Sequence, residues 1–356
     1  MDFPKYDGNV HPNEWINDIQ KYLRLKNVSN KYNEHLEIAI LLVDSTISLP
    51  PGIDNFGKLR KALKEDNSFT IFKNTNKRKL QSLKYIPESN NGDTSKFIST
   101  FRRLCYNAEI NDIEEQKKYL NKSLPMNEYF SNEFYERVEY IISTDELIRE
   151  FENIVSEESD LITNESIVAL KHVSTGKYLS SINDLRYTTG STSQMIFAGG
   201  LVPSPNSLWK IKFDKELATY ANTPIKLQHI KSNKFLGIYY YEYDNNGRYV
   251  DDYHISPSTN NTEVCCNNPN TKDQFWIENW KLYHSEFDQI YLRSNDIINL
   301  SIKKSTNLDE FLRSHDAQFA IGDDTFQEVI CHNERIGSND DWCIELIKQH
   351  VWTVDM

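Results

Sequence analysis

The sequence lacks the features that mark several large protein classes. Glycine is scarce, with 12 of 356 residues, which argues against Gly-rich loops that cradle phosphates. No apolar run approaches the roughly 18 residues of a membrane span, and residues 1–10 contain neither the basic nor the apolar segment of a secretory signal. We therefore expect a cytoplasmic protein without membrane insertion.

The sequence also has fewer basic than acidic residues, and its formal net charge is −12. Residues 1–157 contain 22 Lys and Arg against 25 Asp and Glu, a net of −3, and the remaining residues contain 18 against 27, a net of −9. Because nucleic-acid binding depends on a basic face that displaces counterions from phosphates, we expect no nucleic-acid partner. The one basic cluster, formed by Lys73, Lys77, Arg78 and Lys79, is typical of a solvated helix face.

Catalytic motifs are missing too. The five cysteines contain no Cys-x-x-Cys pair, and no P-loop, dinucleotide-binding, zincin or nucleophile-elbow motif occurs. The remaining acidic and histidine clusters are better explained as solvated loop or barrel positions, namely Asp251, Asp252 and His254, and also His315, Asp316 and His332. We therefore expect a non-enzymatic protein with no catalytic residue, metal or cofactor.

The N-terminal half has the apolar spacing of helices. Apolar residues recur at intervals of three and four residues, with Thr94, Asn111 and Thr144 as candidate N-caps. The segments with this pattern are 12–23, 36–43, 56–63, 69–83, 94–108, 111–124, 130–141 and 144–155. We expect residues 1–157 to form an all-α domain of eight helices.

The pattern changes at the acidic stretch 157–160. Helical spacing gives way to apolar residues at every second position, interrupted by Gly, Asn, Ser and Pro. We expect an acidic linker over residues 158–164 and an all-β domain over residues 165–350. The fold class is then α+β multidomain.

The C-terminal half contains a threefold repeat. Segment 168–179 is similar to segment 225–236, and a third unit opens at 290–294. Each unit closes on a tryptophan, at Trp209, Trp276 and Trp342, which lie 67 and 66 residues apart. Short strands with one apolar face become stable when three such units close on one another, so we expect a β-trefoil of about twelve strands.

The repeat also predicts the core of this barrel. Its expected lining residues are Leu170, Trp209, Leu227, Trp276, Leu292 and Trp342. His172 and His229 occupy equivalent positions, with Ser294 at that position in the third unit. This equivalence favours a structural role for both histidines.

The repeat resembles the MIR domain, the β-trefoil module of protein O-mannosyltransferases and of inositol trisphosphate and ryanodine receptors. The residues that carry the resemblance are 170–179, 312–319, 327–331 and 339–342. The middle unit departs from the pattern, because Asn233 replaces the turn glycine and an insertion spans 239–253. The resemblance implies a binding or interaction module rather than a catalyst.

The N-terminal half resembles the Gag capsid proteins of gypsy-type LTR retrotransposons. The matching positions are Phe3, Gly8, Pro12 and Trp15, followed by segments 68–83 and 97–125. The resemblance implies a helical domain that self-associates, so a homo-oligomer is expected. The zinc knuckle and the aspartic protease motif of such elements are absent, and an unrelated helical bundle remains the alternative.

Tyrosines crowd the 239–253 insertion. We take Tyr240, Tyr243, Tyr249 and Asp252 as candidate ligand-binding residues, because tyrosine gives a large contact area at low entropy cost; the alternative is that alternate tyrosines pack on the barrel wall. The expected ligand is a protein or a glycan. The second hypothesis is a lectin-like trefoil associated with sugar processing, because Gln274-x-Trp276 matches a motif of ricin-type lectins.

Overall fold

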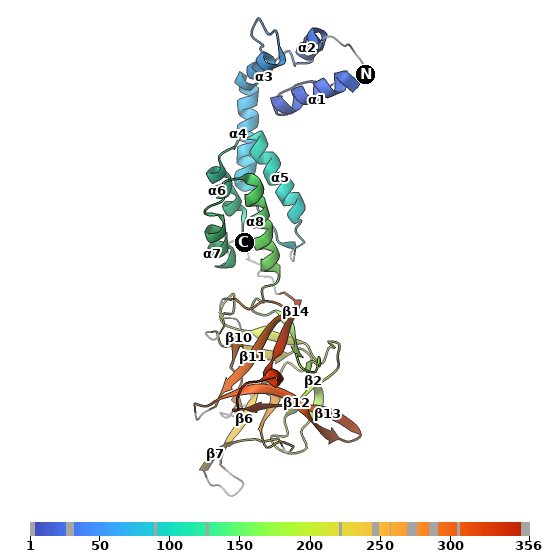
Figure 1. Ribbon diagram of the computed structural model, residues 1–356, viewed down its shortest axis with the longest axis vertical. Helices are drawn as coiled ribbons and strands as arrows, with labels where there is room; N and C mark the ends of the chain where they lie inside the picture. The colour runs from blue at the N-terminus through green and yellow to red at the C-terminus, as the bar shows by residue number, and fades with distance from the viewer. Residues whose placement is uncertain are drawn as a thin grey trace. The chain divides into compact units, whose positions relative to one another are not determined.

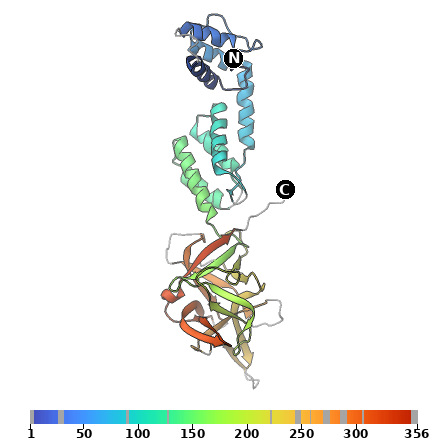
Figure 2. The same ribbon diagram turned by 90° about the vertical axis from the view of Figure 1, so that its right-hand side faces the viewer.

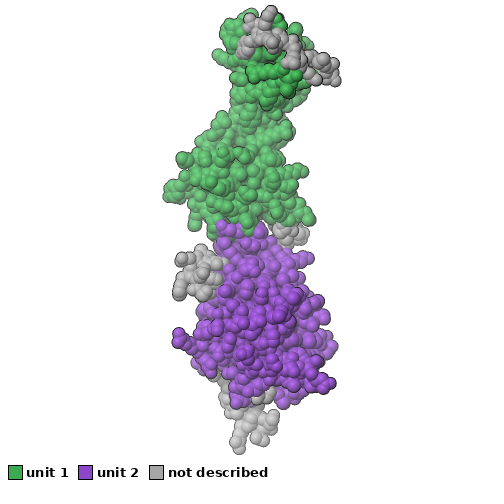
Figure 3. All heavy atoms as spheres, turned by 45° about the vertical axis from the view of Figure 1, so that its right-hand side comes forward, with its two compact units in different colours: residues 1–156 green, residues 157–356 purple. Residues whose placement is uncertain are grey.

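The computed structural model describes residues 4–25, 32–88, 91–125, 128–220, 223–243, 249–256, 258–268, 276–284, 291–304 and 307–349. The chain divides into two compact units, residues 1–156 and 157–356 (Figure 3). Among the described residues, no helix combines the length and the apolar character that crossing a membrane requires.

The first unit is helical, as its apolar spacing predicts (Figure 1). The described part contains all eight expected helices: α1 (Pro12–Leu25), α2 (Tyr32–Leu41), α3 (Phe56–Glu65), α4 (Asn67–Ser82), α5 (Thr94–Asn107), α6 (Ile113–Ser123), α7 (Glu128–Val138) and α8 (Thr144–Ser159). Helices α4 and α5 pack side by side in both ribbon views (Figures 1 and 2).

The N-caps lie close to the predicted positions, but not on them. Asp93 caps α5 by accepting from Lys96 N, and Asp112 caps α6 by accepting from Glu115 N. For α8, Ser143 Oγ accepts from Glu146 N at 3.3 Å. In each case a second good capping residue stands next to the predicted one, and Asp93 and Asp112 have the extended backbone that a cap requires.

The basic cluster on α4 is paired rather than simply solvated. Lys73 Nζ lies 3.3 Å from Glu109, and Lys77 Nζ lies 2.9 Å from Glu115 of α6. These pairs hold α4 beside the following helices, although half-exposed ion pairs of this kind contribute little stability each.

The second unit is made of β-strands. The described part contains β1 (Ile167–His172), β2 (Leu179–Arg186), β3 (Gln194–Ala198), β4 (Trp209–Lys212), β5 (Lys226–His229), β6 (Phe235–Tyr243), β7 (Tyr249–Tyr253), β8 (Thr262–Asn267), β9 (Trp276–Ile277), β10 (Trp280–His284), β11 (Asp296–Lys303), β12 (Asp309–Ile321), β13 (Asp324–His332) and β14 (Trp342–Lys348).

Six of these strands close a barrel. The antiparallel neighbours follow the ring β1–β4–β5–β10–β11–β14 and return to β1, with the β5–β10 contact made by the bridge between Ile225 and Trp280. Closure leaves no free edge in this ring, which removes the exposed hydrogen-bonding groups that invite aggregation.

Three hairpins cap the barrel. They are β2–β3, β6–β8 and β12–β13, and their second strands pair with one another as β3–β8, β8–β13 and β13–β3. A closed six-stranded barrel capped by three hairpins is a β-trefoil, as the repeat predicts. Strands β7 and β9 are additions to the middle unit, where both pair with β6.

The barrel tryptophans correct one core prediction. Trp209, Trp280 and Trp342 are each 0% exposed. Their indole nitrogens donate to the carbonyls of Leu179, Leu236 and Leu312, which precede them by 30, 44 and 30 residues. Trp280, and not Trp276, is therefore the core tryptophan of the middle unit.

The position equivalent to the two histidines also differs from the prediction. Trp342 pairs with His172, Trp209 with His229 and Trp280 with Ile302. Ile302, and not Ser294, therefore occupies this position in the third unit. An apolar residue fills the site there because its environment is the barrel core.

The other predicted core residues are buried, although one has a different place in the repeat. Leu170, Leu227 and Leu292 are 1% exposed or less. Leu170 and Leu227 pair with Ile344 and Ile211 on the barrel strands. Leu292 instead lies where three short segments meet, because its carbonyl accepts from Ile162 N and its own N–H donates to Ala218 O.

The predicted linker has regular structure. Helix α8 continues to Ser159, and Leu161 and Thr163 bridge to Arg293 and Leu217 of the second unit. The stretch is acidic, but its backbone groups are used in these pairings, so residues 158–164 do not form a free connection.

Candidate functional site

The β6–β7 hairpin has two different faces. On one face Tyr240 packs against the barrel core, and its ring centroid lies 5.4 Å from that of the buried Tyr253. Leu236 and Ile238 precede Tyr240 on the same face, because alternate residues of a strand point to the same side. The alternative that some tyrosines pack on the barrel wall therefore holds for Tyr240.

The opposite face of the hairpin has a strip of aromatic rings. The imidazole of His254 lies 5.3 Å from the ring of Tyr239 and 5.1 Å from that of Tyr241, between centroids. Trp276 of β9 pairs directly with Tyr239, which places both side chains on one side of the sheet. We call Tyr239, Tyr241, His254 and Trp276 the outer aromatic face.

A glycine allows the Trp276 ring to lie close to β6. A Cβ at Gly237 would stand 2.7 Å from Cζ2 of the Trp276 ring. The indole nitrogen of Trp276 donates to Glu278 Oε2 at 2.9 Å, and the other Glu278 oxygen lies 2.7 Å from Lys226 Nζ. The half-buried Trp276 is therefore held at the surface and not in the core.

Asp252 adds a negative charge to this face. It pairs with Tyr241 across the hairpin, and its side chain is exposed. One carboxylate oxygen accepts from Tyr253 N at 2.8 Å. Burial lowers the pKa of His254 despite the opposing effect of Asp252, so the imidazole is neutral at pH 7.

The predicted ligand-binding residues thus separate. Asp252 lies on the outer aromatic face, and Tyr240 lies on the core side. Tyr243 and Tyr249 pair in the backbone register of the hairpin, but their side chains lie outside the described residues, as does Gln274. The sequence analysis did not select Tyr239, Tyr241 and His254. Alternation along 236–241, counted from the buried Leu236, could have indicated that Tyr239 and Tyr241 face away from the core.

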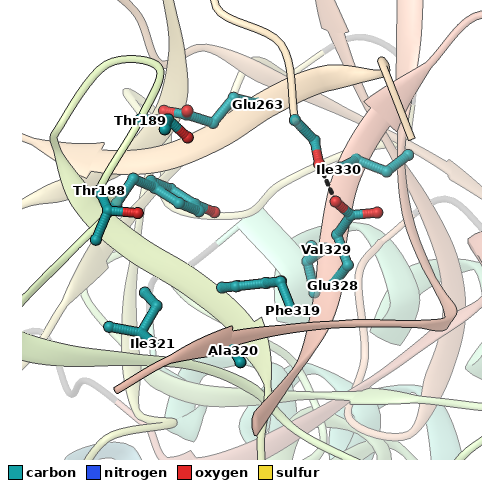
Figure 4. A pocket seen from close by; sticks show the side chains of 11 residues that line it. Thr188, Thr189, Glu263, Phe319, Ala320, Ile321, Glu328, Val329 and Ile330 are labelled. Carbon is teal, nitrogen blue, oxygen red and sulfur yellow. Dashed lines mark hydrogen bonds between the residues drawn. The ribbon is translucent and has the colours of Figure 1, made fainter. Parts of the chain in front are cut away.

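A second feature is a small pocket between the capping hairpins (Figure 4). It encloses about 70 Å³, which admits water or a small polar group but no sugar ring. The residues that line it include Glu263, Phe319 and Glu328. Glu328 accepts from Ser256 Oγ and from Thr259 Oγ1, and the second of these bonds is 3.0 Å long.

The pocket glutamates occupy equivalent places in the threefold repeat. Register pairs of the capping strands are Gln194–Cys266, Thr262–Cys331 and Gln327–Ala198. These pairs are equivalent in the three units, so the residues that follow Gln194, Thr262 and Gln327 are equivalent as well. They are Met195, Glu263 and Glu328. Each glutamate is bound by a serine of the preceding unit, Ser191 for Glu263 and Ser256 for Glu328, so the carboxylates hold neighbouring units together.

Burial raises the pKa of Glu263 to about 7. Gly190 has φ +68° and lies so close to the carboxylate that a Cβ there would stand 2.0 Å from Oε2. Nearby, His315 Nδ1 accepts from Ala317 N at 3.3 Å, and His315 Nε2 lies 2.9 Å from a carboxylate oxygen of Glu328. The pocket is thus polar, but its carboxylates already have intramolecular partners.

The third unit contains a buried charge cluster. Asp340 accepts from Arg313 Nε at 2.9 Å, from His332 Nε2 at 2.8 Å and from Gly337 N at 2.7 Å. Burial opposes ionisation, but these partners lower the pKa of Asp340 to about 2. The cluster fixes the loop between β13 and β14, while Asp316, the neighbour of His315, is not part of it.

The repeat histidines have matching structural bonds. His172 Nδ1 lies 2.9 Å from Thr175 Oγ1 and Nε2 lies 3.0 Å from the carbonyl of Asn339. His229 makes the same two contacts, with Ser232 Oγ at 2.9 Å and Asn206 O at 3.1 Å. Burial lowers the pKa of both rings, so both are neutral at pH 7.

The helical unit has an exposed apolar patch. Tyr135 of α7 is 65% exposed, and Tyr140 and Ile142, which follow that helix, are each 84% exposed. A cavity of about 530 Å³ next to Tyr135 is lined by residues of α6 and α7, among them Lys118 and Phe134. Strongly exposed apolar side chains this close together in the sequence are candidates for a contact surface.

No group of three or more His, Cys, Asp and Glu that could hold a metal ion occurs among the described residues.

Comparison with family models finds no match, and comparison with curated proteins finds none either.

Solved structures include several that are similar to part of this chain. An SDF2-like protein from Arabidopsis thaliana has 24% sequence identity and a TM-score of 0.41, over 52% of this chain and 94% of its own. The protein O-mannosyltransferase Pmt1–Pmt2 complex of S. cerevisiae has 15% identity and a TM-score of 0.39, over 78% of this chain and 40% of its own. A ricin B-like lectin from Macrolepiota procera has 13% identity and a TM-score of 0.30, over 52% of this chain and 98% of its own. The trefoil assignment rests on the threefold pairing of this chain's own strands.

Proposed function

We propose that this chain is a non-enzymatic interaction protein, with a MIR-type β-trefoil as its binding module. The observation that carries the proposal is the outer aromatic face. Three aromatic side chains of that face, from Tyr239, Tyr241 and Trp276, lie on the outside of the barrel next to the exposed Asp252. Tyrosine and tryptophan supply large, rigid contact areas, which is typical of recognition surfaces.

The bonding of the buried titratable groups supports a non-catalytic role. His172 and His229 make equivalent bonds, Glu263 and Glu328 occupy equivalent positions, and Asp340 is bound by three partners. A general acid or base must reach a substrate atom, whereas these groups are used to hold the repeat together.

We propose that the helical unit is a Gag-capsid-type domain that self-associates in the cytoplasm. The support is that the described part of this unit contains eight helices, the element type that the resemblance implies, and that the patch of Tyr135, Tyr140 and Ile142 offers an apolar contact surface. Self-association would display several trefoils together, which raises their avidity for a partner with repeated sites.

The second candidate function is glycan binding. An aromatic ring beside a carboxylate suits a sugar, because the ring covers an apolar sugar face while the carboxylate accepts from hydroxyl groups. The outer aromatic face offers both, with Tyr241 opposite Asp252. The lectin reported above was solved with lactose, and here a sugar would occupy the outer aromatic face rather than the small pocket.

The test is a pair of arrays, one of glycans and one of peptides, probed with the full chain and with a Tyr239→Leu/Tyr241→Leu variant. Tyr106→Leu, at an exposed tyrosine of the helical unit outside the apolar patch, is the matched control. Binding that the double variant loses and the control keeps supports the proposal. Binding that survives the double variant on both arrays contradicts it.

A further inference from the structure

The carboxylate of the outer aromatic face, that of Asp252, has no Lys or Arg partner among the described residues. Within the part of the chain that the structure describes, no Lys or Arg lies within ion-pair distance of Asp252. By contrast, Glu278, beside Trp276, is paired with Lys226 at 2.7 Å. Among the described residues, the exposed Asp252 is thus a negative charge without a Lys or Arg partner, and it stands opposite Tyr241 in the hairpin.

The net charge of the C-terminal half has the same sign as Asp252. Residues 158–356 contain 18 Lys and Arg against 27 Asp and Glu, a net of −9. Net charge of this size attracts cations and repels acidic partners. The faces of tyrosine and tryptophan rings are themselves negative, so they attract an ammonium or guanidinium group placed over them.

We propose that the outer aromatic face binds the cationic side chains of a basic peptide segment, with the Lys or Arg head group over the ring of Tyr241 or Tyr239 and near Asp252. This inference rests on the proposed function, in which the same face is the trefoil's binding surface, and adds the chemistry of the ligand. The stem of the side chain packs along the rings, while the charged end contacts the carboxylate.

A cationic ligand explains the features better than a neutral sugar does. A sugar gains from the rings and from one hydroxyl contact with Asp252, but it gains nothing from the net charge of −9. A basic segment gains from the rings, the carboxylate and the net charge together. Glycan binding is therefore an outcome that the experiment must separate.

The experiment is a fluorescence anisotropy titration of the full chain with a labelled peptide of alternating glycine and lysine. A second peptide carries acetyl-lysine at the same positions, which keeps the stem and removes the charge. The protein variants are Tyr241→Phe, Tyr241→Leu and Asp252→Asn, with Tyr106→Leu, at an exposed tyrosine of the helical unit, as the control. Tyr241→Phe and Tyr241→Leu leave the net charge unchanged, so they separate ring contact from general attraction.

The inference predicts that the lysine peptide binds and the acetylated peptide does not. Tyr241→Phe should bind as well as the parent, because phenylalanine retains the ring, and Tyr241→Leu should bind about two- to fivefold more weakly. Asp252→Asn should weaken binding by up to about fivefold. Tyr106→Leu should have no effect.

Two results overturn the inference. One is equal binding of the lysine and acetyl-lysine peptides, and the other is equal binding by Tyr241→Phe and Tyr241→Leu. If the face variants then change only glycan binding on the arrays, the inference fails while the proposed function stands. If they change neither peptide nor glycan binding, both fail.

Discussion

The two tryptophans of the middle unit should respond very differently to truncation. Trp280 is fully buried and donates to the carbonyl of Leu236 at 3.0 Å, whereas Trp276 is half-buried on β9. Replacing a buried tryptophan by alanine costs about 3–5 kcal/mol, through lost burial and the cavity left behind. Trp280→Ala also leaves a buried carbonyl without its donor.

For a unit of roughly 200 residues, 1 kcal/mol corresponds to about 2–4 °C in Tm. Trp280→Ala should therefore lower the Tm of the trefoil transition by roughly 6–20 °C, and Trp276→Ala by only about 2–4 °C. Differential scanning calorimetry of the full chain measures this without relying on tryptophan fluorescence. A Trp276→Ala variant that loses as much stability as Trp280→Ala would refute the assignment of the core tryptophan.

Three further predictions concern buried ionisable groups. Glu263 has a pKa of about 7 in the folded chain against an ordinary value of 4.5, so its ionisation destabilises the fold as pH rises from 4.5 to 7. Glu263→Gln should remove this loss of stability. In urea titrations, the unfolding free energy of the variant minus that of the parent should grow by on the order of 2–3 kcal/mol between pH 4.5 and 7.5. Asp340 has a pKa of about 2, so its contribution to stability is present above pH 3.8 and lost as pH falls toward 2. Asp340→Asn, which leaves Arg313 with the exposed Glu334 as its acidic partner, should cost about 3 kcal/mol at pH 7, and an unchanged denaturation midpoint would argue against the buried cluster. Burial lowers the pKa values of His172 and His229, so stability should fall as pH drops below 6.5. His229→Gln should make that fall shallower. A variant whose stability depends on pH as the parent's does would show that the ring is not buried as described.

The helices and the threefold repeat could be predicted because both follow from short-range periodicity. Burial on one side of a helix or strand imposes a regular spacing, and the spacing is visible without any knowledge of contacts. The residue that caps α5 could not be fixed in the same way. Asp93 and Thr94 are both good caps, and only the backbone conformation decides between them.

Trp276 shows where repeat spacing misleads. Its distance from Trp209 and Trp342 is nearly equal, at 67 and 66 residues, but spacing identifies equivalent residues only if the units have equal length. The Leu–Trp separation is 44 residues in the middle unit and 30 in the other two. The added strands β7 and β9 account for the difference and move the core position to Trp280.

The candidate site could be located from the sequence only as a region. Crowded tyrosines in the 239–253 insertion marked the hairpin, but which of them faces outward depends on register, and a shift of one residue exchanges the two faces. The pairing of Tyr239 with Trp276, from a strand far along the chain, is a long-range contact that no local pattern contains.

The mass of the chain in solution tests directly whether the chain self-associates through its helical unit. Size-exclusion chromatography with light scattering on the full chain, with residues 1–156 alone for comparison, should give multiples of the 41.7 kDa chain mass that grow with concentration. Ile142→Lys, in the exposed patch of the helical unit, should shift the distribution toward the single chain. A mass of 41.7 kDa at every concentration and salt level would contradict an assembly that displays the trefoil.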